Sequence, residues 1–166
     1  MYPGGRADPL ARRLSLLWAA VFSVGLLPRR WVALEVLGRR SGQIRRFPVG
    51  MADVGREWYL VSMLGENCNW VRNVRAADGR AVIHRRRRVP CRLIEVPIEE
   101  RAPVLRRYLI KVPGGRPHIP VDRDASPAEL RAIAARYPVF HVVPDSDMDR
   151  TAFSSMPIWS RVRLGP

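Results

Sequence analysis

A turn between two apolar runs carries the first group of residues that could bind a ligand. Arginines stand at both ends of the segment Gly38–Arg46, and polar or small residues lie between them. Phosphate binding needs fixed hydrogen-bond donors together with positive charge, and a polar turn with exposed amides supplies both. The spacing alone leaves a second interpretation open, a solvated hairpin turn with incidental charge. The candidate ligand-binding residues of this turn are Arg39, Arg40, Ser41, Gly42, Gln43 and Arg45.

A second polar segment, Ser62–Arg75, could supply the rest of the same pocket. Its glycine, Gly65, permits a positive φ or a close backbone approach. Asn69 is predicted to be the N-cap of a short helix through Ala77, where free backbone amides favour negative charge. Trp70 could stack on a planar ligand or lie buried in the core. The candidates here are Ser62, Met63, Leu64, Gly65, Trp70 and Asn73.

The charge of the chain points to an anionic partner. Lys+Arg total 29 and Asp+Glu total 15 in 166 residues, so the formal net charge is +14. Such a chain attracts nucleic acid, anionic lipid or a phosphorylated cofactor. The four arginines at 85–88 are predicted to form an exposed hairpin end, but no aromatic residues are interleaved with them. Since no nucleic-acid-binding motif accompanies them, we expect no nucleic-acid partner.

Metal chemistry has little support in the sequence. The three histidines are scattered and show no metal-ligand spacing, and the two cysteines are isolated. We therefore expect no metal site and a reducing, cytoplasmic location. Only His118, in a segment rich in Gly and Pro at 113–124, is retained as a candidate pocket residue.

The pattern of apolar runs and turn residues predicts an α+β or mainly β protein. Short strands are expected at 31–37, 44–51, 57–62, 80–85, 89–96 and 138–143. Helices are expected at 69–77, 99–111 and 126–136, the last opened by a capping box with Pro127 at its first position. The first three strands are joined by short turns and must form an antiparallel meander. Six such strands in one small domain favour closure into a barrel.

The first 28 residues are predicted to hold one more helix, from Asp8 to about Val24. Its apolar run is shorter than the roughly 20 residues needed to span a bilayer. It could pack on the domain or on a dimer partner, and the alternative is an interfacial anchor on anionic lipid. We expect one domain over residues 1–143, made of this helix, a barrel at 31–96, and helices with a final strand at 97–143. A C-terminal tail would follow at 144–166.

These two segments resemble the motifs of the deazaflavin (coenzyme F420)-dependent nitroreductase and quinone reductase family. The run Gly38-Arg39-Arg40-Ser41-Gly42-Gln43-Ile44-Arg45 matches that family's Gly-Arg-Lys-Ser/Thr-Gly-x-x-Arg turn, with Arg40 in place of Lys. Val61-Ser62-Met63-Leu64-Gly65 resembles its Ala-Ser-x-Gly-Gly loop. Trp70-Val71-Arg72-Asn73-Val74-Arg75-Ala76 resembles its Trp-x-x-Asn-Leu-x-Ala helix start. The resemblance covers roughly residues 32–96.

The resemblance implies a split β-barrel of flavin-reductase type, with six or seven antiparallel strands. It also implies that the turn binds the phosphate and acidic tail of coenzyme F420, while Ser62, Met63, Leu64, Trp70 and Asn73 hold the deazaflavin ring. FMN is the alternative cofactor. The expected activity is hydride transfer between the reduced cofactor and a small apolar acceptor such as a quinone or nitro compound, with no catalytic acid or base assigned. The N-terminal helix and the 113–124 segment would control acceptor access.

Other readings of the chain stay open at this point. The protein could be a non-catalytic carrier of flavin, deazaflavin or another anionic ligand. Its N-terminal helix could also bring it to a membrane surface, and split barrels of this kind are often homodimers.

Overall fold

The computed structural model describes residues 30–84 and 87–145. The predicted N-terminal helix and residues 146–166 of the predicted tail lie outside these ranges. Across the described ranges, no helix is both long enough and apolar enough to cross a membrane.

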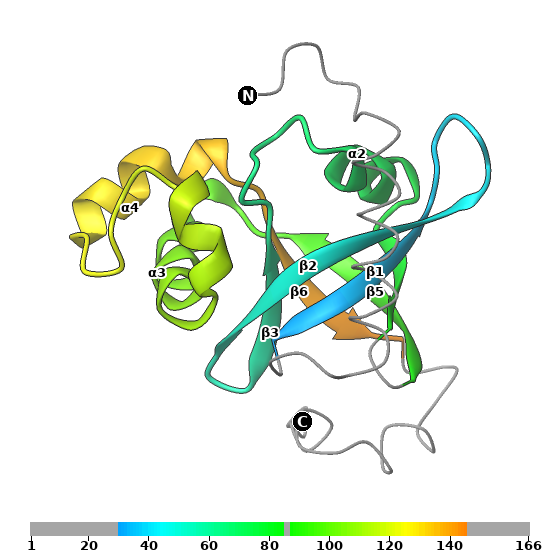
Figure 1. Ribbon diagram of the computed structural model, residues 1–166, viewed down its shortest axis with the longest axis horizontal. Coiled ribbons are helices and arrows are strands. Elements are labelled where there is room, and N and C mark those ends of the chain that lie inside the picture. The colour runs from blue at the N-terminus through cyan, green and yellow to red at the C-terminus, as the bar shows by residue number, and fades with distance from the viewer. Residues whose placement is uncertain (1–29, 85–86, 146–166) are drawn as a thin grey trace.

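Six antiparallel strands close into a barrel, as predicted (Figure 1). They pair in the order β1-β2-β3-β6-β5-β4. The first three form the expected meander, and β2 extends beyond its predicted end at Met51 because the turn to β3 needs only Gly55 and Arg56. The strands are β1 (Trp31–Leu37), β2 (Ile44–Val54), β3 (Glu57–Val61), β4 (Arg80–His84), β5 (Arg88–Glu95) and β6 (Val139–Pro144).

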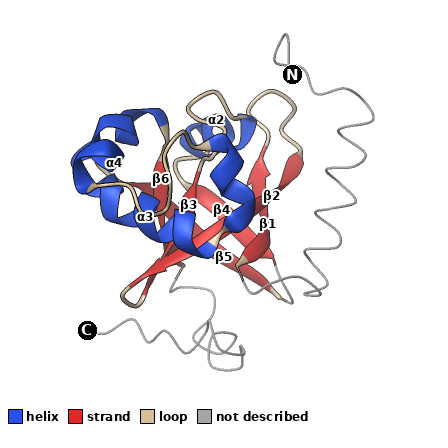
Figure 2. Cartoon of the chain, turned by 60° about the vertical axis from the view of Figure 1, so that its left-hand side comes forward, coloured by secondary structure: helices blue, strands red, loops and turns tan. Residues whose placement is uncertain are grey.

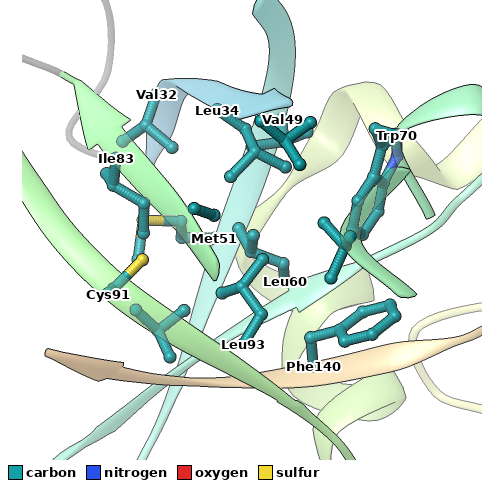
Figure 3. Packing of buried hydrophobic residues seen from close by; sticks show 14 of the residues in the cluster. Val32, Leu34, Val49, Met51, Leu60, Trp70, Ile83, Cys91, Leu93 and Phe140 are labelled. Atoms are coloured by element: carbon teal, nitrogen blue, oxygen red, sulfur yellow. The ribbon is translucent and has the colours of Figure 1, made fainter. Parts of the chain in front are cut away.

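The barrel is filled by apolar side chains from every strand (Figure 3). Alternate residues point inward, as a β-strand requires. Trp70 lies among this cluster and its ring centroid is 5.4 Å from that of Phe140. The cluster includes Val32, Leu34, Val49, Met51, Leu60, Trp70, Ile83, Cys91, Leu93 and Phe140.

The helices that follow β5 lie against the outer wall of the barrel (Figure 2). A second apolar core lies between them and this wall. Helix α3 (Arg101–Lys111) packs across β2, and α4 (Pro127–Ile133) packs on α3. Tyr108 of α3 is 1% exposed and reaches this wall because Gly115 leaves room for its ring. A Cβ atom at Gly115 would lie 2.3 Å from the Tyr108 ring.

The helix ends differ from the sequence-based bounds. The predicted capping box is confirmed, since the Glu129 amide donates to Ser126 Oγ and the Ser126 amide donates to Glu129 Oε2. The predicted helix to Arg136 tightens into a 3-10 turn at Ala134–Arg136. The helix expected from Glu99 is preceded by a 3-10 turn, Ile98–Glu100, and the predicted loop at 113–124 contains another, Pro113–His118.

Candidate functional site

The turn after β1 has a compact and defined shape. The Gly38 amide donates to the Gln43 carbonyl and the Gly42 amide donates to the Gly38 carbonyl, both at 2.8 Å. Gly42 has a φ of +63°, which residues with a side chain rarely adopt. A Cβ atom at Gly38 would lie 2.8 Å from Ser41 Oγ. The two glycines therefore allow the turn to fold back on itself.

This turn is attached to helix α2 (Asn69–Ala76) by Arg39. Its guanidinium Nη1 donates to Asn73 Oδ1 at 2.8 Å, and its backbone amide donates to the same oxygen at 3.3 Å. The guanidinium also donates to Asn69 Oδ1 at 3.4 and 3.5 Å. The two sequence segments are thus brought together, as predicted. Both acceptors are neutral amides, so they hold the guanidinium without cancelling its charge.

The cations of the turn are not neutralised. Arg39, Arg40 and Arg45 are all exposed, and none forms an ion pair with any residue that the structure describes. One arginine of β2 and one of β5, in contrast, share a buried carboxylate. Glu35, 1% exposed, contacts Arg46 at 2.7 Å and Arg88 at 2.6 Å. Positive charge that could attract an external anion is therefore available at the turn.

The second segment forms a tight loop at the entrance to α2. Ser62 is fully buried, and its hydroxyl donates to the Gly65 carbonyl at 2.8 Å. The Gly65 amide donates back to the Ser62 carbonyl, and Gly65 has a φ of +84°. Leu64, at the tip, is 60% exposed. Ser62 therefore shapes the loop, while Leu64 presents an apolar surface to solvent.

Two details of this segment differ from the sequence-based expectations. Cys68, not Asn69, is the N-cap of α2, and it makes no side-chain cap hydrogen bond. The side-chain oxygen of Asn69, Oδ1, instead accepts from the Arg39 guanidinium, so this side chain contacts the turn and does not cap its own helix. Of the two interpretations of Trp70, the structure supports a core residue, because Trp70 is 7% exposed and packs inside the barrel. The ring packs among the core side chains, and a contact between Trp70 and a ligand stays a prediction.

A pocket of about 270 Å³ lies beside the loop tip. One wall comes from the loop at 63–65, and the other walls come from segments much later in the chain. His118 contributes to it, as the sequence suggested, whereas Arg136 and Tyr137 were not anticipated. The Tyr137 hydroxyl donates to the His118 carbonyl at 3.1 Å and so ties two walls together. The lining residues are Met63, Leu64, Gly65, His118, Arg136 and Tyr137.

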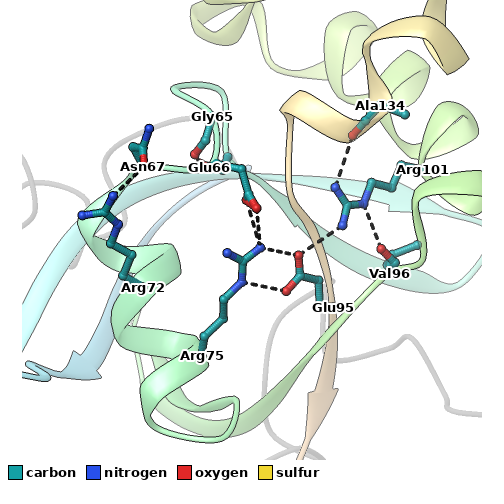
Figure 4. Close-up of polar contacts among 10 residues, drawn as sticks. Gly65, Glu66, Asn67, Arg72, Arg75, Glu95, Val96, Arg101 and Ala134 are labelled. Atoms are coloured by element: carbon teal, nitrogen blue, oxygen red, sulfur yellow. Dashed lines mark hydrogen bonds and ion pairs between the residues drawn. The ribbon is translucent and has the colours of Figure 1, made fainter.

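A chain of ion pairs fixes the loop relative to the other walls (Figure 4). Arg75 of α2 contacts Glu66 of the loop at 2.9 Å and Glu95 of β5 at 2.7 Å. Glu95 also contacts Arg101, which is 6% exposed. The Glu95 contact, followed by Glu66, raises the pKa of Arg75, and Arg75 lowers the pKa of Glu95.

Arg101 extends this connection to the segment that precedes Arg136 and Tyr137 of the pocket. Its Nε donates to the Val96 carbonyl at 2.8 Å and its Nη1 donates to the Ala134 carbonyl at 3.2 Å. Ala134 begins the 3-10 turn that ends at Arg136, directly before Tyr137. Sequence reasoning missed Arg101, because an arginine at a helix start is normally solvated. The ion pairs thus link the loop, α2 and the segment that forms the far wall.

The assembled site suits an anionic ligand with a flat apolar part. The turn offers exposed guanidinium groups and amides, which match phosphate and carboxylate oxygens. The loop tip and the pocket offer apolar surface of limited size. No group of three or more potential metal ligands occurs across residues 30–84 and 87–145. The guanidinium groups and amides of the turn therefore fit a phosphate-bearing organic ligand.

Comparisons with known proteins give the family. The model for the F420H2-dependent quinone reductase family matches residues 22–116. A comparison with curated proteins finds no match.

The solved structures that match are remote in sequence. One, described as a domain-swapped dimer, is 18% identical with a TM-score of 0.51, and the match covers 80% of this chain and 96% of that one. An Agrobacterium tumefaciens protein of unknown function is 12% identical with a TM-score of 0.53, covering 86% and 57%. An F420-H2-dependent reductase is 21% identical with a TM-score of 0.47, covering 72% and 98%. At these identities the first two structures support the fold alone.

Proposed function

This chain belongs to the F420H2-dependent quinone reductase family, and from that premise we propose that the turn at 38–45 and the loop at 62–65 form its cofactor site. The protein is a deazaflavin-dependent oxidoreductase, and coenzyme F420 is its cofactor. In the proposed arrangement, Arg39, Arg40 and Arg45 bind the phosphate and the acidic tail. Met63 and Leu64 flank the deazaflavin ring.

The observation that carries this proposal is the contact between Arg39 and Asn73. These residues belong to separate motifs, 34 positions apart, yet a 2.8 Å hydrogen bond joins them. Asn73 is 4% exposed and so acts from beneath the turn rather than on the ligand. A guanidinium held in place by neutral acceptors loses little entropy when an anion binds, which favours affinity.

The protein's own contribution to the reaction is binding and orientation. The cofactor supplies the hydride chemistry when it is bound. Ser62 holds the loop through the Gly65 carbonyl, and Gly65 shapes it. Trp70 supports the helix start from inside the barrel. Ser41, Gly42 and Gln43 offer the hydroxyl, the amides and the side-chain amide of the turn to the phosphate. We assign no catalytic acid or base, and we propose a quinone or a nitro compound as the acceptor.

A fluorescence titration with oxidised coenzyme F420 tests the assignment. We expect saturable binding to the wild-type protein and at least tenfold weaker binding to Arg40→Ala, since a charge-assisted contact contributes about 1.5–3 kcal/mol. Arg56→Ala is the matched control, because Arg56 is an exposed arginine in the turn at the opposite end of β2. Equal affinity of wild type and Arg40→Ala would contradict the site. FMN as competitor tests the alternative cofactor.

Three earlier predictions stay proposals. Homodimerisation is tested by sedimentation of the full chain. A membrane-surface association through the predicted N-terminal helix, as the alternative to a cytoplasmic protein, is tested by flotation with anionic liposomes at moderate salt. The proposed acceptor class is tested by comparing turnover with quinones and with nitro compounds.

A further inference from the structure

The pocket beside the loop tip combines apolar walls with two basic residues. We propose that it binds the acceptor, and that it selects planar one- or two-ring oxidants that carry an acidic substituent such as a carboxylate or sulfonate. Arg136 and His118 would bind the acidic group. This inference rests on the proposed cofactor site, because the pocket shares Met63 and Leu64 with it.

The size of the pocket matches a small planar acceptor. Its volume of about 270 Å³ lies just below the range of roughly 300–1,000 Å³ that is typical of sites for drug-sized ligands. Met63, Leu64 and Tyr137 provide apolar surface on more than one side. A flat acceptor of one or two rings therefore fits this volume.

The residues that line the pocket include basic side chains and no acidic ones. The six lining residues include Arg136 and His118 and no Asp or Glu. No ion pair or side-chain hydrogen bond occupies Arg136 or His118 among the residues that the structure describes, so both can meet a ligand. A guanidinium binds a carboxylate or sulfonate through two parallel hydrogen bonds, and an imidazole can add a third donor.

The place of these residues in the chain supports a role in acceptor choice. The family match ends at residue 116, whereas His118, Arg136 and Tyr137 all lie beyond it. Residues 38–45 and 62–73 lie inside the match. We therefore expect the cofactor shared by the family to bind within the matched part. The pocket walls beyond residue 116 are where this chain can differ from other family members in the acceptor that it binds.

The walls of the pocket are held in fixed positions, which allows the pocket to discriminate between acceptors. The Tyr137 hydroxyl holds the His118 carbonyl, and Arg101 holds the Ala134 carbonyl at the start of the turn that bears Arg136. Glu95 connects Arg101 to Arg75, which in turn holds Glu66 of the loop. Opposite walls are therefore connected by hydrogen bonds and ion pairs, so the basic groups keep a defined position relative to the loop.

The test compares two acceptors that share one ring system. With F420H2 as reductant, we would measure kcat/KM for 1,4-naphthoquinone and for its 2-sulfonate, and take their ratio. Intrinsic differences in reactivity cancel when this ratio is compared between variants. We expect Arg136→Gln to lower the preference for the sulfonate about tenfold and His118→Gln to lower it several-fold. Arg136→Lys should retain most of it.

Arg131→Gln is the matched control, since Arg131 is an exposed arginine on α4 outside the pocket. It removes the same charge and should leave the ratio unchanged. An equal ratio in wild type and Arg136→Gln, or an equal fall in Arg131→Gln, would overturn the proposal. A fall confined to the pocket variants would support it.

Equilibrium binding gives a second readout that needs no turnover. We would titrate naphthalene-2-sulfonate into the full chain without cofactor by calorimetry. We expect binding that Arg136→Gln weakens about tenfold and Arg131→Gln does not. Absence of binding, or displacement of the sulfonate by coenzyme F420, would overturn the acceptor assignment. Normal F420 binding with no sulfonate selectivity would refute this inference alone, whereas loss of F420 binding would refute the cofactor site.

Discussion

Replacing Asn73 by aspartate separates the position of Arg39 from its charge. In the wild type a neutral oxygen holds the guanidinium at 2.8 Å. Asn73→Asp puts a carboxylate at nearly the same place, so Arg39 stays in position but its charge is compensated. The buried carboxylate has Arg39 and the Arg39 amide as partners, so the fold should tolerate it.

The effect on cofactor binding follows from Coulomb's law. A phosphate bound to the far side of the guanidinium would lie roughly 7 Å from the new carboxylate. At an effective dielectric constant of about 20 to 40, the repulsion is about 1–2 kcal/mol. The affinity for coenzyme F420 should therefore fall about 5- to 30-fold, and the loss should shrink at high salt because exposed charges are screened.

The assay is F420 fluorescence titration at 0.05 and 0.5 M salt, with thermal unfolding as a check on folding. Ala128→Asp is the control for net charge, because Ala128 is an exposed position in the first turn of α4, where an acidic residue is favourable. Unchanged affinity in Asn73→Asp, with unchanged melting temperature, would refute the claim that the charge of Arg39 is used in binding.

Three further outcomes are expected. Arg75→Met should weaken F420 binding several-fold and lower the melting temperature by a few degrees, because Glu66 and Glu95 lose their shared partner. An unchanged affinity and melting temperature would mean that these ion pairs do not hold the loop in place. Burial opposes ionisation of Asp53, but hydrogen bonds from arginines lower its pKa to about 2. Its stabilisation is therefore present above the ordinary pKa and lost as the pH falls from about 4 to 2. Asp53→Asn should cost about 1 kcal/mol at pH 7, after allowance for solvent screening, and only a small fraction of that at pH 2, where the carboxyl is about half protonated, in urea unfolding. Burial raises the pKa of Cys91 to about 12, so iodoacetamide at pH 8 should label it only after denaturation, which mass spectrometry would detect.

The strands could be predicted because local patterns determine them. Trp31–Leu37 is rich in β-forming residues and ends at a glycine turn, and its observed bounds equal the predicted ones. The capping box at Ser126 was equally predictable, since its two hydrogen bonds join residues three apart. The closed order of the barrel was not predictable in detail, because the pairing of β3 with β6 joins residues far apart in the chain.

The site was predictable as a set of segments but not as a set of roles. The motifs identified the turn and the loop, yet no local pattern indicates that Asn69 would accept from Arg39 instead of capping its own helix. Trp70 has the same sequence context whether its ring faces a ligand or the core, and only the packing against Phe140 decides. Arg136 could not be identified from the sequence, because its pocket is assembled from three segments that lie far apart in the chain.

A crystal structure of the full chain with coenzyme F420 tests the central claim most directly. We expect the phosphate within hydrogen-bonding distance of the guanidinium groups of Arg39 and Arg40, and the deazaflavin ring against Leu64. Asn73 should still accept from Arg39 beneath the ligand. A cofactor bound elsewhere on the barrel, with the turn free of contacts, would contradict the account.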